Sequence, residues 1–110
     1  MSARHQPQER NLGRRAEAHE VNVAPHNFYG HLCTMMNAHF AAAVPNLRIM
    51  ETDIDRIAWD HELFSHVPEF VDGHLIMPNR PGWGIEPNEA AIRARPAKGP
   101  QGLLNYGRNK

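Results

Sequence analysis

The sequence has one cysteine, no net charge and no long hydrophobic run. With Cys33 alone, the 110-residue chain cannot form an intramolecular disulfide framework. Twelve basic and twelve acidic side chains cancel, so no overall positive field indicates binding to nucleic acid or to an anionic membrane. No apolar segment approaches the roughly 20 residues of a transmembrane helix, and the polar start lacks the hydrophobic region of a secretory signal. We therefore expect a cytoplasmic protein with no nucleic-acid or membrane partner.

The length allows one small domain flanked by two polar segments. Residues 1–13 contain Pro7, Gly13 and many polar side chains without an apolar period, which predicts a disordered or displaced N-terminus. Residues 96–110 are rich in glycine, proline and lysine and are predicted to be a flexible tail. The folded portion is expected at residues 14–95.

Two short apolar segments are predicted to be strands of a parallel α/β unit. In residues 21–26 the side chains alternate, so that His26 ends one face, and Pro25 favours termination of the strand there. In residues 47–51, Leu47, Ile49 and Glu51 share a face. Each strand thus ends on an ionisable side chain, which is the layout of an active site at the carboxyl edge of a parallel sheet.

The segments between and after the strands are predicted from helical spacing and turn chemistry. Residues 28–44 carry a broad apolar stripe at helical spacing and are stopped by proline, which predicts a helix. Residues 54–70 indicate loop and short helix. Asp72 and Gly73 predict a tight turn between extended segments, and residues 81–84 a second turn. A short helix over residues 88–95 begins with Asn88 as its N-cap.

The histidines and the cysteine suggest alternative chemistries. His26, at a strand exit, can act as a general acid or base near neutral pH, with a structural histidine as the alternative. His26, His31 and His39 are five and eight residues apart, and neither gap is the four-residue step that places two imidazoles together on a helix. No zinc or copper site is therefore predicted, although a histidine-rich metal-binding protein stays an alternative. Cys33, on the predicted helix, is expected to be a buried apolar thiol.

An ordered set of motifs resembles the carboxyl-terminal part of the mandelate racemase and muconate lactonizing enzyme family, of the enolase superfamily. The resemblance covers about residues 14–95 and is closest to the mandelate racemase-like branch. The motifs are, in order, Val23-Ala24-Pro25-His26-Asn27, Asn37-Ala38-His39-Phe40-Ala41-Ala42-Ala43-Val44-Pro45-Asn46, Met50-Glu51, Asp72-Gly73 and Pro81-Gly82-Trp83-Gly84-Ile85-Glu86.

The resemblance implies a fold, a reaction and two site residues. The fold class would be α/β, with this chain supplying about the last two strands of a TIM-type (β/α) barrel and the segment that returns to a capping domain. The family uses Mg²⁺ held by acidic residues to abstract the proton α to a carboxylate. His26 matches the acid/base histidine that ends the seventh barrel strand. Glu51 matches the glutamate of the eighth strand, thought to hydrogen-bond the substrate carboxylate or the enediolate.

The sequence also departs from the family pattern. The strands that carry the metal ligands, the lysine and the aspartate that orients the histidine have no counterpart here, so no residue is assigned to metal and we expect the chain alone not to bind Mg²⁺. One hypothesis is a partial enzyme whose full-length relative is a sugar-acid dehydratase, racemase or cycloisomerase acting on a small carboxylate, and which is inactive alone. The other is a non-catalytic remnant that forms a homo-oligomer or binds a complementing barrel fragment through open strand edges.

Overall fold

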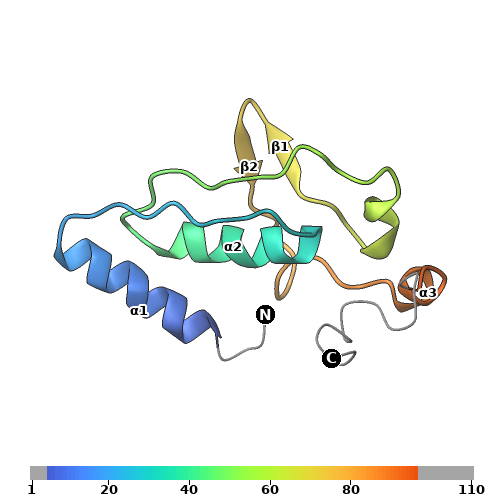
Figure 1. The fold of residues 1–110 in the computed structure, drawn as a ribbon, viewed down its shortest axis with the longest axis horizontal. Helices are drawn as coiled ribbons and strands as arrows, with labels where there is room; N and C mark the ends of the chain where they lie inside the picture. Colours follow the sequence, from blue (N-terminus) through green and yellow to red (C-terminus); the bar gives the residue numbers. More distant parts are fainter. Residues whose placement is uncertain (1–4, 97–110) are drawn as a thin grey trace, which may run out of the picture.

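The computed structural model describes residues 5–96, and its elements surround one central helix (Figure 1). The elements, in chain order, are α1 (His5–Ala18), α2 (His31–Ala43), the 3-10 helix η1 (Asp60–Leu63), β1 (Glu69–Val71), β2 (His74–Ile76) and α3 (Glu89–Arg93). Among these described residues, no helix has the length and apolarity to cross a membrane. Of the predicted flexible tail, only Pro96 falls within the described residues.

α2 is the helix predicted over residues 28–44, and it forms the centre of the fold. It begins after Gly30 and ends before Val44, whose extended backbone leads into Pro45. Its buried face carries both apolar and polar side chains: Thr34, Met35, Asn37, Ala38 and Ala41. The apolar members pack into the core, and the polar members turn toward the chain that precedes the helix.

The two predicted strands run side by side along α2, but they form a single parallel bridge rather than regular strands (Figure 1). The bridge joins Val23 to Leu47, and the backbone N–H of Arg48 donates to the carbonyl of Val23 at 2.8 Å. Farther along, the N–H of Glu51 reaches the carbonyl of Pro25 at 3.4 Å. The predicted strands are corrected to extended segments, because a proline removes one backbone donor and each segment has only one neighbour within residues 5–96.

The apolar core is small. Met35, Ala38 and Ile85 are its buried members, and five half-buried side chains pack against them: Leu32, Met50, Phe64, Leu75 and Trp83. Other large apolar side chains lie in solvent, such as Ile49 and Ile54, which are 66% and 86% exposed. Met50 points into the core while its neighbour Ile49 does not, as expected for alternating side chains of an extended segment.

α1 corrects the prediction of disorder for residues 5–13, which are helical. Gly13 allows a close approach to the end of α2, since a Cβ there would lie 3.2 Å from Cγ1 of Val44. The side-chain amide of Asn46 then donates to the carbonyls of Gly13 and Val21, at 3.1 and 3.0 Å. The helix is therefore held by residues more than 30 positions away in the sequence, which local composition does not reveal.

The predicted turns and the last helix cap are confirmed. Asp72 and Gly73 have φ values of 50° and 73° and close the antiparallel hairpin of β1 and β2. Gly84, at φ 81°, lies so close to Pro78 that a Cβ would be 2.4 Å from the ring. Asn88 caps α3 by accepting a hydrogen bond from the N–H of Ala91 at 3.3 Å.

Candidate active site

His26 and Glu51 meet where the two extended segments end. Nδ1 of His26 lies 2.6 Å from Oε2 of Glu51, and the backbone N–H of Asn27 donates to the same oxygen at 2.9 Å. The parallel bridge between Val23 and Leu47 explains the meeting, because it brings both segment exits to the same end of the unit. The side chains of His26 and Glu51 are 65% and 47% exposed, so the pair is accessible to a ligand.

The hydrogen bonds determine where the protons lie. The N–H of Asn27 lowers the pKa of Glu51 below its ordinary value of 4.5, and the hydrogen bond from His26 lowers it further, while partial desolvation opposes both. Glu51 is therefore ionised at neutral pH and can only accept hydrogen bonds. Nδ1 of His26 must be the donor, so in the neutral ring Nε2 carries the lone pair that can take a proton.

A buried polar network anchors the chain at this point. The side chain of Asn27 is fully buried; its Nδ2 donates to Oγ1 of Thr34 at 3.0 Å, and its Oδ1 accepts from Nδ2 of Asn37 at 3.2 Å. The same Asn37 amide reaches the carbonyl of His26 at 3.3 Å. The sequence analysis did not assign Asn27, Thr34 or Asn37 to the site. A usable signal was present: Thr34 and Asn37 share a helix face at three-residue spacing, beside a strand exit that carries Asn27.

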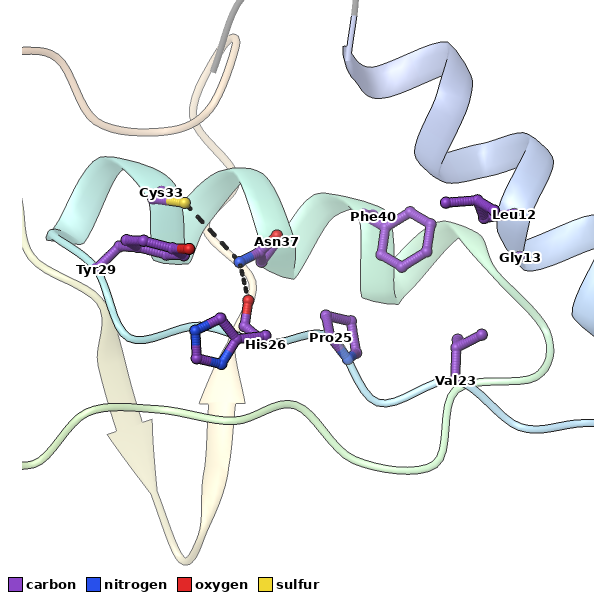
Figure 2. Close-up of a pocket in the computed structure, with 9 residues that line it drawn as sticks. All are labelled: Leu12, Gly13, Val23, Pro25, His26, Tyr29, Cys33, Asn37 and Phe40. Carbon is purple, nitrogen blue, oxygen red and sulfur yellow. Dashed lines mark hydrogen bonds between the residues drawn. The ribbon is translucent and has the colours of Figure 1, made fainter.

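A groove of about 670 Å³ opens between the segment of His26, α1 and α2 (Figure 2). Figure 2 shows the His26 ring at one end of the groove and Leu12 of α1 at the other. The Tyr29 ring packs edge-on against the His26 ring, with centroids 5.5 Å apart. The lining is mostly apolar and consists of Leu12, Gly13, Val23, Pro25, His26, Tyr29, Cys33, Asn37 and Phe40.

His31 belongs to a second, separate cluster with Arg56 and Asp60. Nε2 of His31 lies 3.1 Å from Oδ1 of Asp60, and Arg56 donates to Oδ2 of Asp60 at 2.7 Å and to Nδ1 of His31 at 3.1 Å. Arg56 also donates to the carbonyl of Tyr29 at 2.8 Å. Burial lowers the pKa of His31, and the Arg56 cation lowers it further. The neutral ring thus ties the start of α2 to the segment that follows Glu51.

The described residues contain no candidate metal centre. Among them, no three side chains of histidine, cysteine, aspartate or glutamate come together as ligands. Glu51 supplies the carboxylate of the candidate site, and its Oε2 atom already accepts hydrogen bonds from His26 and Asn27. The donor set around it does not fit Mg²⁺, which prefers several oxygen ligands in octahedral geometry.

Comparison with known protein families identifies the family of this chain. The family model described as enolase C-terminal domain-like matches residues 9–91. The chain belongs to this family. The resemblance of the motifs around His26, Glu51 and Gly73 to the mandelate racemase branch of the enolase superfamily is thereby confirmed, and an α/β unit of the TIM-barrel superfamily is supported.

Three relatives illustrate the range of the family. D-xylonate dehydratase of Haloferax volcanii is 30% identical over 84 residues, which cover 76% of this chain and 20% of that protein. The crystal structure of a candidate L-alanine-DL-glutamate epimerase from Burkholderia xenovorans strain LB400, bound to magnesium and fumarate, is 63% identical with a TM-score of 0.83, covering 96% of this chain and 26% of that one. A candidate mandelate racemase or muconate lactonizing enzyme from Labrenzia alexandrii DFL-11 is 28% identical, with a TM-score of 0.73 over 83% of this chain and 24% of that one.

The chain spans 20% of the length of the curated dehydratase that it matches. The family includes sugar-acid dehydratases and enzymes assigned as epimerases, and solved members bind magnesium.

Proposed function

We propose that this chain supplies the acid/base end of an enolase-superfamily active site that acts on a sugar acid or another α-hydroxy acid. The observation that carries the proposal is the 2.6 Å contact between His26 and Glu51 at the exits of two parallel segments. It leaves Nε2 of His26 with a lone pair on an exposed ring, which is what a general base needs. The dehydratase relative supports a sugar acid as the substrate class.

In the proposed reaction, Nε2 of His26 takes the proton from the carbon next to the substrate carboxylate, and the electron pair of the broken bond moves into the carboxylate. Two outcomes can follow this step. Racemisation or epimerisation needs a second acid on the opposite face of that carbon to deliver a proton there, and a complete barrel would have to supply it, whereas giving the His26 proton to a departing 3-hydroxyl releases water and gives dehydration. We favour dehydration. No step is assigned to Mg²⁺ here, because residues 5–96 bring together no ligand set for it.

Glu51 has a second role in this proposal. The resemblance implies a hydrogen bond from Glu51 to the substrate carboxylate or the enediolate, and both of these partners are anions. An ionised Glu51 would repel them, so it performs this role only after taking up a proton. An approaching carboxylate favours that uptake, since a like charge nearby raises the pKa of a carboxyl group.

A chimera tests the proposal in a complete barrel. Residues 9–91 of this chain replace the matching part of the 63%-identical Burkholderia xenovorans protein. Exchange of the α-proton is followed by NMR in D₂O across a panel of aldonic and other α-hydroxy acids. We expect exchange that is lost in His26→Asn and retained in His19→Asn, a matched change at an exposed histidine at the end of α1. Full exchange in the His26→Asn chimera would refute the role of His26.

The chain by itself is expected to give no measurable turnover of α-hydroxy acids with Mg²⁺. Two segment exits form only part of a barrel edge, and the groove beside His26 is open to solvent, where charged interactions are weak. Turnover by the isolated chain above that of its His26→Asn variant would show that residues beyond these two segments are not needed.

A non-catalytic interaction protein is the second candidate. Two features favour it: the open, mostly apolar groove of Figure 2 and an unpaired backbone edge. Asn22 and Ala24 have no backbone hydrogen bond to any described residue, so the free edge of their segment can accept another extended segment. The occupant would be a second copy of the chain or a complementing barrel fragment. Light scattering after gel filtration tests this: a monomer that unfolds cooperatively would remove the need for a partner, whereas a dimer or a stable complex with the fragment would support it.

A further inference from the structure

The His26–Glu51 pair is exposed, and hydrogen bonds rather than packing define its arrangement. The His26 ring lies edge-on to Tyr29 and its Nδ1 meets Glu51, yet the side chain stays 65% exposed. Exposed side chains that lack packing ordinarily sample several rotamers. The hydrogen bonds to Glu51 are therefore the contacts able to keep the pair in this geometry.

Asn27 is the residue that connects the pair to the buried part of the fold. Its backbone N–H donates to Oε2 of Glu51, which is the same oxygen that accepts from Nδ1 of His26. Its side chain is completely buried and is bound on both sides, by Thr34 and by Asn37. A hydrogen-bonded path thus runs from the core face of α2 to the carboxylate of Glu51 and from there to the His26 ring.

The chemistry of this position requires an amide. Oδ1 of Asn27 accepts a hydrogen bond from Asn37 while Nδ2 donates one to Thr34, so the residue must be donor and acceptor at once. Thr34 in turn donates to the carbonyl of Gly30 at 3.3 Å, which leaves its oxygen free to accept from Asn27. Aspartate at this position would lose the donor to Thr34, and alanine would remove one hydrogen bond each from Thr34 and Asn37.

We propose that Asn27 is a positioning residue for the His26–Glu51 pair: its buried side chain fixes the backbone N–H that holds Glu51, and Glu51 in turn fixes the proton on Nδ1 of His26. The proposal rests on the proposed function only where it treats His26 and Glu51 as an acid/base pair. The placement of the pair by Asn27 is a separate structural claim. It predicts that Glu51 and His26 change their proton positions when Asn27 is altered, although Asn27 has no ionisable group.

The test uses the full 110-residue chain, with ¹³C NMR of the Glu51 carboxyl and ¹⁵N NMR of the His26 ring. In Asn27→Ala we expect the pKa of Glu51 to rise toward its ordinary value and the His26 signals to move to a mixture of Nδ1–H and Nε2–H forms. Thr34→Val keeps the volume but removes one partner of Asn27, so we expect smaller shifts in the same directions. Asn22→Ala is the matched control, because this asparagine lies exposed on the same segment and its side chain makes no hydrogen bond within the described part of the chain.

Unchanged Glu51 and His26 signals in Asn27→Ala would overturn the proposal. Should that variant fail to fold, unchanged signals in Thr34→Val would do so instead. In the chimera, Asn27→Ala is expected to lower kcat for α-proton exchange by roughly tenfold to a hundredfold, as small misplacements of a catalytic group do. A parent chimera without exchange would count against the proposed function alone, since the NMR measurements of the chain would still decide the role of Asn27.

Discussion

Replacing Arg56 by glutamine tests how firmly the loop after Glu51 is held against α2. Arg56 donates hydrogen bonds to Asp60, His31 and the carbonyl of Tyr29. Glutamine is shorter and uncharged, so we expect all three to be lost. The contact between His31 and Asp60 would remain. The variant therefore measures what the guanidinium contributes to the free energy of unfolding.

The expected magnitude follows from the exposure of the cluster. The side chains of Arg56, Asp60 and His31 are only 25%, 17% and 13% exposed. Hydrogen bonds to charged groups contribute about 1.5–3 kcal/mol each when well shielded. Partial solvent screening, and the partner that Asp60 keeps, reduce the sum, so we expect Arg56→Gln to lower the free energy of unfolding by about 1–3 kcal/mol.

Arg93→Gln is the matched control, measured beside Arg56→Gln by equilibrium urea unfolding. Its ion pair with Glu89 has the same four-residue spacing as the Arg56–Asp60 pair and lies on α3, but its two side chains are 80% and 79% exposed. Such a pair contributes about 0.3–0.5 kcal/mol. Equal losses in the two variants would refute the view that shielding by α2 and the loop makes the Arg56 cluster the stronger contact.

Three further outcomes follow from burial, titration and backbone conformation. Met35 is 1% exposed, so Met35→Ala should lower the free energy of unfolding by about 2–5 kcal/mol. Ile49 is 66% exposed, so Ile49→Ala should change it little. Similar losses for the two variants in urea unfolding would contradict the assigned core. Because the pKa of His31 is lowered in the folded chain, the unfolded chain binds more protons once the pH falls below the ordinary pKa of 6.5. The free energy of unfolding should therefore decrease as the pH decreases from that value. His31→Gln should flatten this decrease, as measured by urea unfolding at several pH values. Gly84→Ala forces φ 81° on a residue with a Cβ and meets a proline ring at 2.4 Å, so its thermal midpoint should drop more than that of Gly73→Ala, where φ is 73° and the space is open.

The elements that the sequence predicted well are those with local causes. The apolar stripe of α2 and the proline after it are read within one helix length, and the turn at Asp72 and Gly73 depends on two adjacent residues with positive φ. The placement of His26 and Glu51 at neighbouring segment exits followed from a simple geometric rule, whereas their direct contact was not predicted. Their roles as catalytic residues stay predictions.

What the sequence did not predict depends on contacts between distant residues. α1 is held through Asn46, and the polar network joins Asn27 to two residues of α2. Strand formation in residues 21–26 also depends on neighbours, since alternation of side chains indicates an extended backbone but does not supply hydrogen-bonding partners. A single bridge forms with the one neighbouring segment that the described part of the chain supplies.

The small core has a calorimetric consequence. The heat capacity change of unfolding comes mainly from apolar surface that becomes exposed, and ordinary domains give about 12–15 cal/mol/K per residue. Here Met35, Ala38, Ala41 and Ile85 are the buried apolar side chains of residues 10–96, and many larger ones already contact water. The chain should therefore show a heat capacity increment per residue below that range and a broad, shallow thermal transition. A partner that covers Ile49 and Ile54 would make the transition both taller and narrower.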